Sequence, residues 1–196
     1  VLMSSYNSQK TLKDSINSVL TQTYKNFEFL IIDDNSSDDT LKILKDFENA
    51  SYQIIWYDDQ NGLSNNRIRC LYKGASGAIW MGTYLGGVNR LFNESFLMHT
   101  RQNGLLDNVI TALNWDNKDS SLWIGSLDRG IGIRNNAGAK RLDESNGISN
   151  NHITSIAHLS SGAAVIGTVD GVNLIEDEEF SQVWDNYNNV FTSNKI

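Results

Sequence analysis

The sequence predicts a composite α+β chain, with an α/β part over residues 1–60 and an all-β part of four-stranded repeats after it. Apolar residues in the first part follow the spacing of alternating strands and helices. In the second part, a phrase that begins with Asn-Gly occurs three times, at separations of 42 and 43 residues. Four short strands in about 42 residues is the period of a β-propeller blade.

Composition and charge exclude several classes of protein. The contents of 40% hydrophobic and 20% charged residues are ordinary for a soluble globular protein. The net charge is -7 and neither part is basic, so we expect no nucleic-acid partner. Cys70 is the single cysteine, which leaves no intrachain disulfide. No apolar run reaches the roughly 18 residues that a membrane span needs, and no charged leader with an apolar core opens the sequence, so we expect neither a membrane span nor a signal peptide.

The first predicted helix lies between Ser8 and Tyr24. Its apolar residues recur at steps of four, three and one, which places them on one stripe of a helix. We expect Asn7 or Ser8 to cap its start, because their side-chain oxygens accept hydrogen bonds from the free amides of a first turn. The apolar stripe consists of Leu12, Ile16, Val19 and Leu20.

Two further strands and a second helix complete the α/β part. Phe27–Ile32 is a nearly continuous apolar run, typical of a strand that is buried on both faces. Gln53–Tyr57 supplies the third strand. The helix between these strands is marked by Leu41, Ile43, Leu44 and Phe47. The resulting β-α-β-α-β order predicts a parallel sheet, which binds its ligands beyond the carboxyl ends of the strands.

Polar clusters follow the first two strands of this sheet. Ser4–Asn7 closes the first strand and Asp33–Ser37 closes the second, so we expect the two loops to face each other across one crevice. Paired carboxylates there could accept hydrogen bonds from a base or a ribose, and the amides of a helix start could receive a phosphate. In the alternative interpretation, Asp34–Asp39 only cap a helix, and Tyr6 is a packing residue with its hydroxyl in water.

The motifs of the α/β part resemble the opening of family 2 glycosyltransferases. They are Met3–Asn7, Ser15–Leu20 with Gln22–Tyr24 and Phe27-Glu28, and Ile32–Asp38. The resemblance covers residues 1–67 and implies a Rossmann-like domain of the GT-A type that binds a nucleotide-diphosphate sugar, with a UDP-sugar expected.

The same resemblance implies a set of nucleotide-binding residues. Ser4 and Tyr6 would lie beside the nucleoside, and Asp34 would bind the base. An arginine near the nucleotide, in the first turn of a third helix, would be Arg67. The complete set is Ser4, Tyr6, Asn7, Asp33, Asp34, Ser36 and Arg67.

A divalent cation, Mn²⁺ or Mg²⁺, is also implied by the family, where an Asp-x-Asp motif holds it against the diphosphate. Such a cation offsets the charge of the leaving phosphates. The sequence contains no Asp-x-Asp, and Asp58-Asp59 comes too early, so we expect these two residues to be solvated loop residues. The acceptor-binding half of the family is missing as well. We therefore assign no metal ligand and no catalytic residue, and expect nucleotide binding without full transferase activity.

The all-β part spans residues 61–186 and consists of three predicted blades. Their ranges are 61–102, 103–145 and 146–186, and a tail follows at 187–196. Fourth strands are expected around Phe96, Lys140 and Phe180.

Large and small residues recur at fixed positions in these blades. Trp80 and Trp123 should fill the space between neighbouring sheets, and Val165 should pack less well at the third equivalent site. The glycines that follow two residues later are expected where a backbone passes closely or bulges, at Gly82, Gly125 and Gly167.

The blade sequence resembles the two-component-regulator propeller of hybrid two-component sensors, in which Asn-Gly-Leu-Ser-x-Asn precedes Leu-Trp-Ile-Gly-Thr and Gly-Gly-Val-Asn-Arg. The resemblance implies a ligand-sensing segment that recognises carbohydrate or a protein partner through its loops. Propellers close with four to eight blades. Three blades would leave open sheet edges able to pair with another chain.

Three hypotheses about function therefore stay open. The chain is a partial glycosyltransferase donor site, which implies the cytoplasm, or a sensor segment, which implies the periplasm. In the third, it is a composite joined at a phrase common to both families, with neither activity. Residues 61–70 open a helix under the first hypothesis and a strand under the second.

Overall fold

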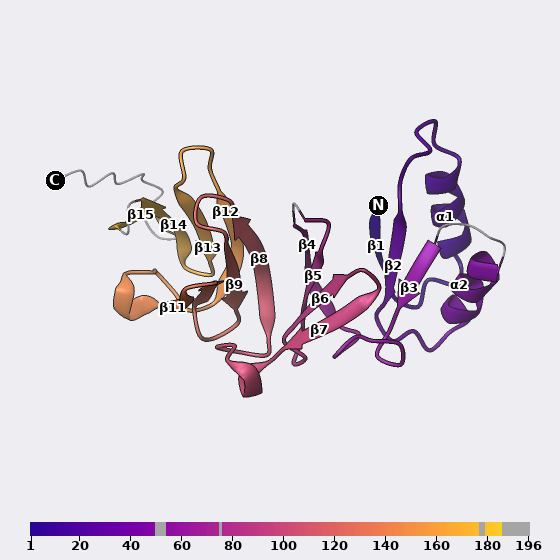
Figure 1. Cartoon of the computed structure of the whole chain (residues 1–196), viewed down its shortest axis with the longest axis horizontal. Coiled ribbons are helices and arrows are strands. Elements are labelled where there is room, and N and C mark those ends of the chain that lie inside the picture. Colours follow the sequence, from indigo (N-terminus) through magenta and orange to yellow (C-terminus); the bar gives the residue numbers. More distant parts are fainter. Residues whose placement is uncertain (50–53, 75, 177–178, 186–196) are drawn as a thin grey trace. The chain divides into compact units, whose positions relative to one another are not determined.

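The structure, a computed structural model, describes residues 1–49, 54–74, 76–176 and 179–185. The chain divides into two compact units, Val1–Ile68 and Arg69–Ile196, here called unit 1 and unit 2. Unit 1 contains a three-stranded parallel sheet and two helices, and unit 2 contains three four-stranded antiparallel sheets (Figure 1). None of the described helices has the length and apolarity required to cross a membrane.

Unit 1 has the predicted order of strands and helices. Its elements are β1 (Leu2–Ser5), α1 (Leu12–Leu20), β2 (Phe29–Asp33), α2 (Thr40–Asn49) and β3 (Ile54–Tyr57). The central strand β2 pairs in parallel with both β1 and β3. Both helices lie on the same side of this sheet, where Phe29 and Ile31 pack into one apolar cluster with Leu12 and Leu44 (Figure 1). Gln53, which the third predicted strand included, lies outside the described residues.

Two element starts in unit 1 were predicted wrongly. Strand β2 begins at Phe29 instead of Phe27. Helix α1 begins at Leu12, and neither Asn7 nor Ser8 caps it. The Ser8 hydroxyl donates to the Tyr6 carbonyl instead, at 3.0 Å, and the Ser8 amide donates to Thr40 Oγ1, at 2.8 Å. Because Ser8 is held in these contacts, the helix starts later.

Unit 2 repeats one sheet three times, and each strand pairs with its neighbour in sequence. The first sheet contains β4 (Ile68–Lys73), β5 (Ile79–Thr83), β6 (Val88–Phe92) and β7 (Ser95–His99). The second contains β8 (Ile110–Asp116), β9 (Ser121–Ser126), β10 (Ile131–Asn135) and β11 (Gly138–Leu142). The third contains β12 (Ile153–His158), β13 (Ala164–Thr168), β14 (Gly171–Glu176) and β15 (Glu179–Asp185). The predicted tail at 187–196 lies outside the described residues.

The recurring Asn-Gly phrase ends a short 3-10 turn that leads from one sheet to the next. The side chain of Asn103 accepts a hydrogen bond from the Thr100 amide at 2.6 Å, and Gly104 follows with a left-handed φ of 101°. Asn146 accepts from Asp143 at 3.0 Å in the same way, and Gly147 has φ 107°. Only glycine adopts this backbone conformation without strain. The phrase therefore recurs because the turn requires it.

Consecutive sheets of unit 2 pack through a glycine of one sheet and an isoleucine of the next. A Cβ atom placed on Gly82 would lie 2.6 Å from Cγ2 of Ile110, and one placed on Gly125 would lie 2.7 Å from Cγ2 of Ile153. No side chain fits at either distance, so both positions need glycine for packing. The sequence analysis expected a backbone to pass closely or bulge at these glycines, but the atoms that approach Gly82 and Gly125 belong to side chains.

A β-bulge in the first strand of the second and third sheets makes this contact possible. Ile110 pairs with Ser126 and Ala112 pairs with Gly125, so Thr111 is an extra residue. Successive side chains of a strand point to opposite faces, and one extra residue reverses this alternation. Ile110 therefore packs against the preceding sheet, while Ala112 packs on the other face, toward the following sheet. Strand β12 repeats the shift between Ile153 and Ser155.

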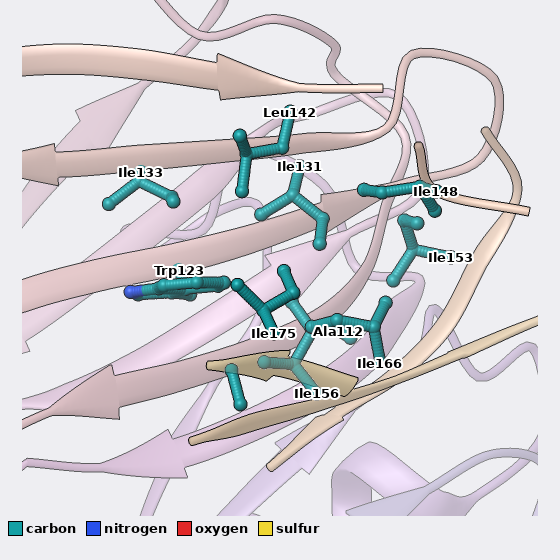
Figure 2. Packing of buried hydrophobic residues seen from close by; sticks show 11 residues of the cluster. Ala112, Trp123, Ile131, Ile133, Leu142, Ile148, Ile153, Ile156, Ile166 and Ile175 are labelled. Carbon is teal, nitrogen blue, oxygen red and sulfur yellow. The ribbon is translucent and has the colours of Figure 1, made fainter. Parts of the chain in front are cut away.

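The space between the second and third sheets is filled by Trp123 and aliphatic residues of both sheets. Trp123 is 7% exposed, which confirms the prediction that it packs between sheets. Figure 2 shows the isoleucines of the cluster gathered around Trp123 and Ala112. Trp80 is only partly buried, and the guanidinium carbon of Arg90 lies 5.6 Å from the centre of its ring.

We predict that Gly125→Ala lowers the free energy of unfolding by about 1–3 kcal/mol, the usual cost of an extra methyl group in a packed core. The branched Ile153 side chain is too stiff to move aside. Gly132→Ala is the matched control, because its Cβ would lie 3.5 Å from the nearest atoms of Leu106. Urea denaturation followed by tryptophan fluorescence measures both. Equal effects of the two substitutions would contradict the packing described here.

Candidate functional site

The carboxyl ends of β1 and β2 are joined by direct hydrogen bonds. The Asp34 amide donates to the Ser5 carbonyl at 2.7 Å, which continues the strand pairing by one residue. The Asn7 amide donates to Ser36 Oγ at 2.9 Å, and Asn7 Oδ1 accepts from the Ser37 amide at 2.8 Å. The two loops that the sequence analysis expected to face each other are thus held together.

Asp33 and Ser36 shape the loop after β2. Asp33 is fully buried, and its two carboxylate oxygens accept hydrogen bonds from the Ser36 amide at 2.8 Å and the Ser36 hydroxyl at 2.6 Å. Asn35, between them, has a left-handed φ of 59°, which asparagine tolerates better than most residues. Both Asp33 oxygens are engaged within the loop, so this residue positions its neighbours.

Asp34 has a different environment from Asp33. It is half-buried, and its Oδ1 atom is buried without a hydrogen-bond partner in the described part of the chain. Burial raises the pKa of the Asp34 carboxyl, the positive charge of Arg67 lowers it, and the negative charge of Asp33 raises it further. Asp34 and Arg67 therefore interact electrostatically, although 33 positions separate them in the sequence.

Ser4 and Tyr6 lie at the surface beside this loop pair. Ser4 is exposed in β1, and Tyr6 is 60% exposed just after the strand. Ser5, between them, is 4% exposed, and its Oγ is buried without a partner among the described residues. Sequence motifs did not single out Ser5, although the alternation of side chains along a strand places it opposite Ser4.

Further contacts between the start of α1 and the start of α2 were also missed. Asp38 Oδ2 accepts from the Gln9 amide at 3.1 Å, and Gln9 Oε1 accepts from the Asp39 amide at 3.0 Å. Asp38 Oδ1 also accepts from the Thr40 amide at 3.0 Å, so this acid does act near a helix start. Neither long-range pair leaves a local sequence signal.

Arg67 lies in the loop ahead of β4, because the strand begins at Ile68. The expectation of a helix beginning at Arg67 is therefore wrong, and the strand alternative holds for this stretch. The Arg67 amide donates to Asn65 Oδ1 at 2.9 Å. This hydrogen bond closes a local turn that leads into the extended strand β4.

The residues present do not fit the divalent cation that the family resemblance implies. Among the described residues, no group of three or more His, Cys, Asp or Glu side chains is placed to hold a metal ion. Asp58 is 6% exposed, so the expectation that it is solvated was wrong. Its Oδ1 accepts from the amides of Gln60 and Asn61, at 2.9 and 3.1 Å, and so closes the turn after β3.

A cavity of about 560 Å³ lies between the second and third sheets of unit 2. Apolar residues including Trp123 and Ile133 line part of it, and Asp116, Lys118 and Asp119 contribute charged groups. Sequence patterns gave no indication of this cavity, because its lining comes from two sheets.

The first part of the sequence matches a known family. The profile of Glycosyl transferase family 2 matches residues 1–81. The chain is 39% identical over 77 residues to the Escherichia coli UDP-Glc:alpha-D-GlcNAc-diphosphoundecaprenol beta-1,3-glucosyltransferase WfgD. The matched stretch covers 39% of this chain and 30% of that protein. It is 35% identical over 68 residues to glycosyltransferase GlyA of Streptococcus pneumoniae, covering 34% and 10% respectively. The chain thus spans less than a third of the length of these relatives.

The fold of the β-rich part is similar to that of solved extracellular domains. The extracellular domain of a hybrid two-component system from B. thetaiotaomicron superposes with a TM-score of 0.58 and 22% identity, over 66% of this chain and 20% of that one. The likeness concerns the fold alone. The chain therefore combines a segment similar in sequence to family 2 glycosyltransferases with a β-rich segment similar in fold to that extracellular domain.

The raised pKa of Asp34 predicts a pH dependence of stability. Below the ordinary value of 3.8, the folded and unfolded chains both carry the proton. As the pH rises from 3.8 to the raised pKa of the folded chain, the unfolded chain loses the proton first, so the free energy of unfolding falls. Asp34→Asn removes this dependence.

The wild-type chain should therefore lose stability relative to Asp34→Asn over that interval and keep a constant difference above it. Urea denaturation of both proteins at a series of pH values measures the difference. A wild-type chain that gains stability over the variant as the pH rises would show that Asp34 is stabilised as the anion.

Proposed function

We propose that unit 1 binds a nucleotide-diphosphate sugar, with a UDP-sugar as the first candidate. The observation that carries the proposal is the buried Asp34 Oδ1 atom without a hydrogen-bond donor among the described residues. A buried acceptor without a partner costs about 1–3 kcal/mol. The imide N–H of a uracil base is a neutral donor that would remove this cost. The family match over residues 1–81 supports the assignment.

The other residues of the predicted site take two kinds of role in this proposal. Asn7, Asp33 and Ser36 position the loops, because their side chains form hydrogen bonds within and between the loops that follow β1 and β2. The exposed Arg67 guanidinium, next to Asp34, attracts the diphosphate, since arginine presents a planar set of donors to phosphate oxygens. Ser4 and the exposed Tyr6 ring contact the nucleoside.

The proposal concerns binding and does not extend to sugar transfer. The relatives are at least three times longer than the matched segment. The residues of the described chain do not fit the cation that would offset the charge of a leaving diphosphate. The proposed site therefore includes no metal ion and no catalytic base.

Calorimetric titration with UDP and UDP-sugars, with and without Mn²⁺ or Mg²⁺, tests this proposal. We expect Asp34→Ala to weaken binding by about 10-fold or more, the effect of losing one hydrogen bond to a charged group. Asp39→Ala is the control, because Asp39 is an exposed acid of the same loop. Absence of heat with every nucleotide would overturn the proposal, as would equal weakening by both substitutions.

A second candidate function is recognition of carbohydrate or of a protein partner by unit 2. Two observations favour it: the sensor-like fold, and the cavity of about 560 Å³ that combines an apolar lining with Asp116 and Asp119. Carboxylates beside an apolar surface suit the hydroxyl groups and C–H faces of a sugar. A glycan array tests carbohydrate recognition directly, and absence of binding to every oligosaccharide would exclude carbohydrate as the ligand of unit 2.

The two candidates imply different compartments, the cytoplasm for sugar-nucleotide binding and the periplasm for sensing. A chain that gives no signal in either assay would correspond to the third hypothesis, a composite with neither activity. The two experiments together therefore separate all three.

A further inference from the structure

Another cavity of unit 2, of about 360 Å³, lies between the first and second sheets. Apolar side chains of both sheets line it, among them Trp80 of β5 and Trp115 of β8. Its volume is within the range of pockets that hold small molecules. It is separate from the cavity beside Trp123 and from the candidate site of unit 1.

Three basic side chains also line this cavity, and each comes from a different strand. Arg90 of β6 and His99 of β7 belong to the first sheet, and Arg134 of β10 belongs to the second. In the described part of unit 2, no Asp or Glu is among the residues that line it. The described lining therefore carries two guanidinium groups and no carboxylate to neutralise them.

At the contact between the second and third sheets, the equivalent positions are apolar. The strand register identifies them, because Arg90 pairs with Trp80 as Ile133 pairs with Trp123. The equivalents of Arg90, His99 and Arg134 are, in that order, Ile133, Leu142 and Ile175. All three are buried in the cluster around Trp123 (Figure 2). Packing of two sheets is thus achieved with aliphatic residues at these positions and does not require basic ones.

Aromatic rings hold Arg90 and His99 in place. The guanidinium carbon of Arg90 lies 5.6 Å from the centre of the Trp80 ring and 5.0 Å from the centre of the Phe92 ring. The His99 ring stacks on Trp80, with the ring centres 6.0 Å apart. Burial lowers the pKa of His99, and the positive charges of Arg134 and Arg90 lower it further. The neutral form of His99 is therefore favoured, and both arginine charges act at the same place.

Arg134 has a donor group without an acceptor. Its side chain is half-buried, and its Nη1 atom is buried without a hydrogen-bond partner among the described residues. A buried donor without a partner costs free energy, and buried charges in proteins are normally paired. An anion in the cavity would remove both costs.

We propose that this cavity binds a small organic carboxylate with a flat, apolar body, such as an aromatic carboxylate. The carboxylate lies between Arg90 and Arg134, because a planar guanidinium donates two parallel hydrogen bonds to a carboxylate. The body of the ligand packs against Trp80 and Trp115. A neutral ligand would leave both charges without a partner. This site is independent of the two functions proposed above.

Calorimetric titration of the whole chain with benzoate tests this proposal. Benzamide has the same ring without the charge, and we expect it to bind about 10-fold or more weakly, the effect of losing a hydrogen bond between charged groups. Equal binding of the two, or no heat with benzoate, would overturn the proposal. Glucuronate carries its carboxylate on a polar ring, and inorganic phosphate has no ring. Either of them binding as tightly as benzoate would overturn the assignment of an apolar carboxylate.

Two substitutions locate the site. Arg90→Met and Arg134→Met should each abolish the preference for benzoate over benzamide, because methionine keeps an unbranched apolar chain without the charge. Arg129→Met is the matched control, since Arg129 is an exposed arginine outside the cavity, and it should keep the preference. Circular dichroism checks that each variant is folded. A preference that survives in both cavity variants, or that the control loses as well, would overturn the proposal.

Discussion

Unit 2 depends on one contact, made twice: the isoleucine at the start of the second and third sheets packs against a glycine of the sheet before it. The contact needs two features together. Glycine must stand where any Cβ would meet the isoleucine within 2.7 Å, as at Gly82 and Gly125. A bulged strand must also turn Ile110 to the preceding sheet and Ala112 to the following one. The buried position of Trp123 follows from this, because the two sheets are already held face to face over it.

The sequence predicted the sheets of unit 2 well and their contacts incompletely. A repeat of fixed length with Asn-Gly turns determines where each strand begins, so β7, β11 and β15 fall where fourth strands were expected. The glycine positions were expected to allow a close approach, but the residue that approaches comes from about 28 positions further on and leaves no local signal. The bulge at Thr111 was likewise invisible, because it exists only in the register between strands.

Unit 1 shows the same division between local and long-range information. Apolar spacing was sufficient to predict both helices and the buried strand. It failed at the start of α1, where Ser8 is tied to Thr40, 32 positions away. In the candidate site, the sequence grouped Asp33 with Asp34, but hydrogen bonding distinguishes them. Asp33 is fully engaged by Ser36, and Asp34 retains an acceptor without a partner among the described residues. Motif resemblance implied a role for Asp34 at the base and none for Asp33, whose part in shaping the loop comes from the structure.

The central claim is that the two units have separate tasks, recognition of a nucleotide in unit 1 and self-supporting sheet packing in unit 2. Hydrogen exchange of the backbone amides, measured with and without UDP, tests this most directly. The account predicts slower exchange on UDP binding at Asn7, Asp34 and Ser37, and unchanged, slow exchange in β8 and β9, which pair with each other, with every side chain of β9 buried. Protection by UDP confined to unit 2, or fast exchange throughout β8 and β9, would contradict it.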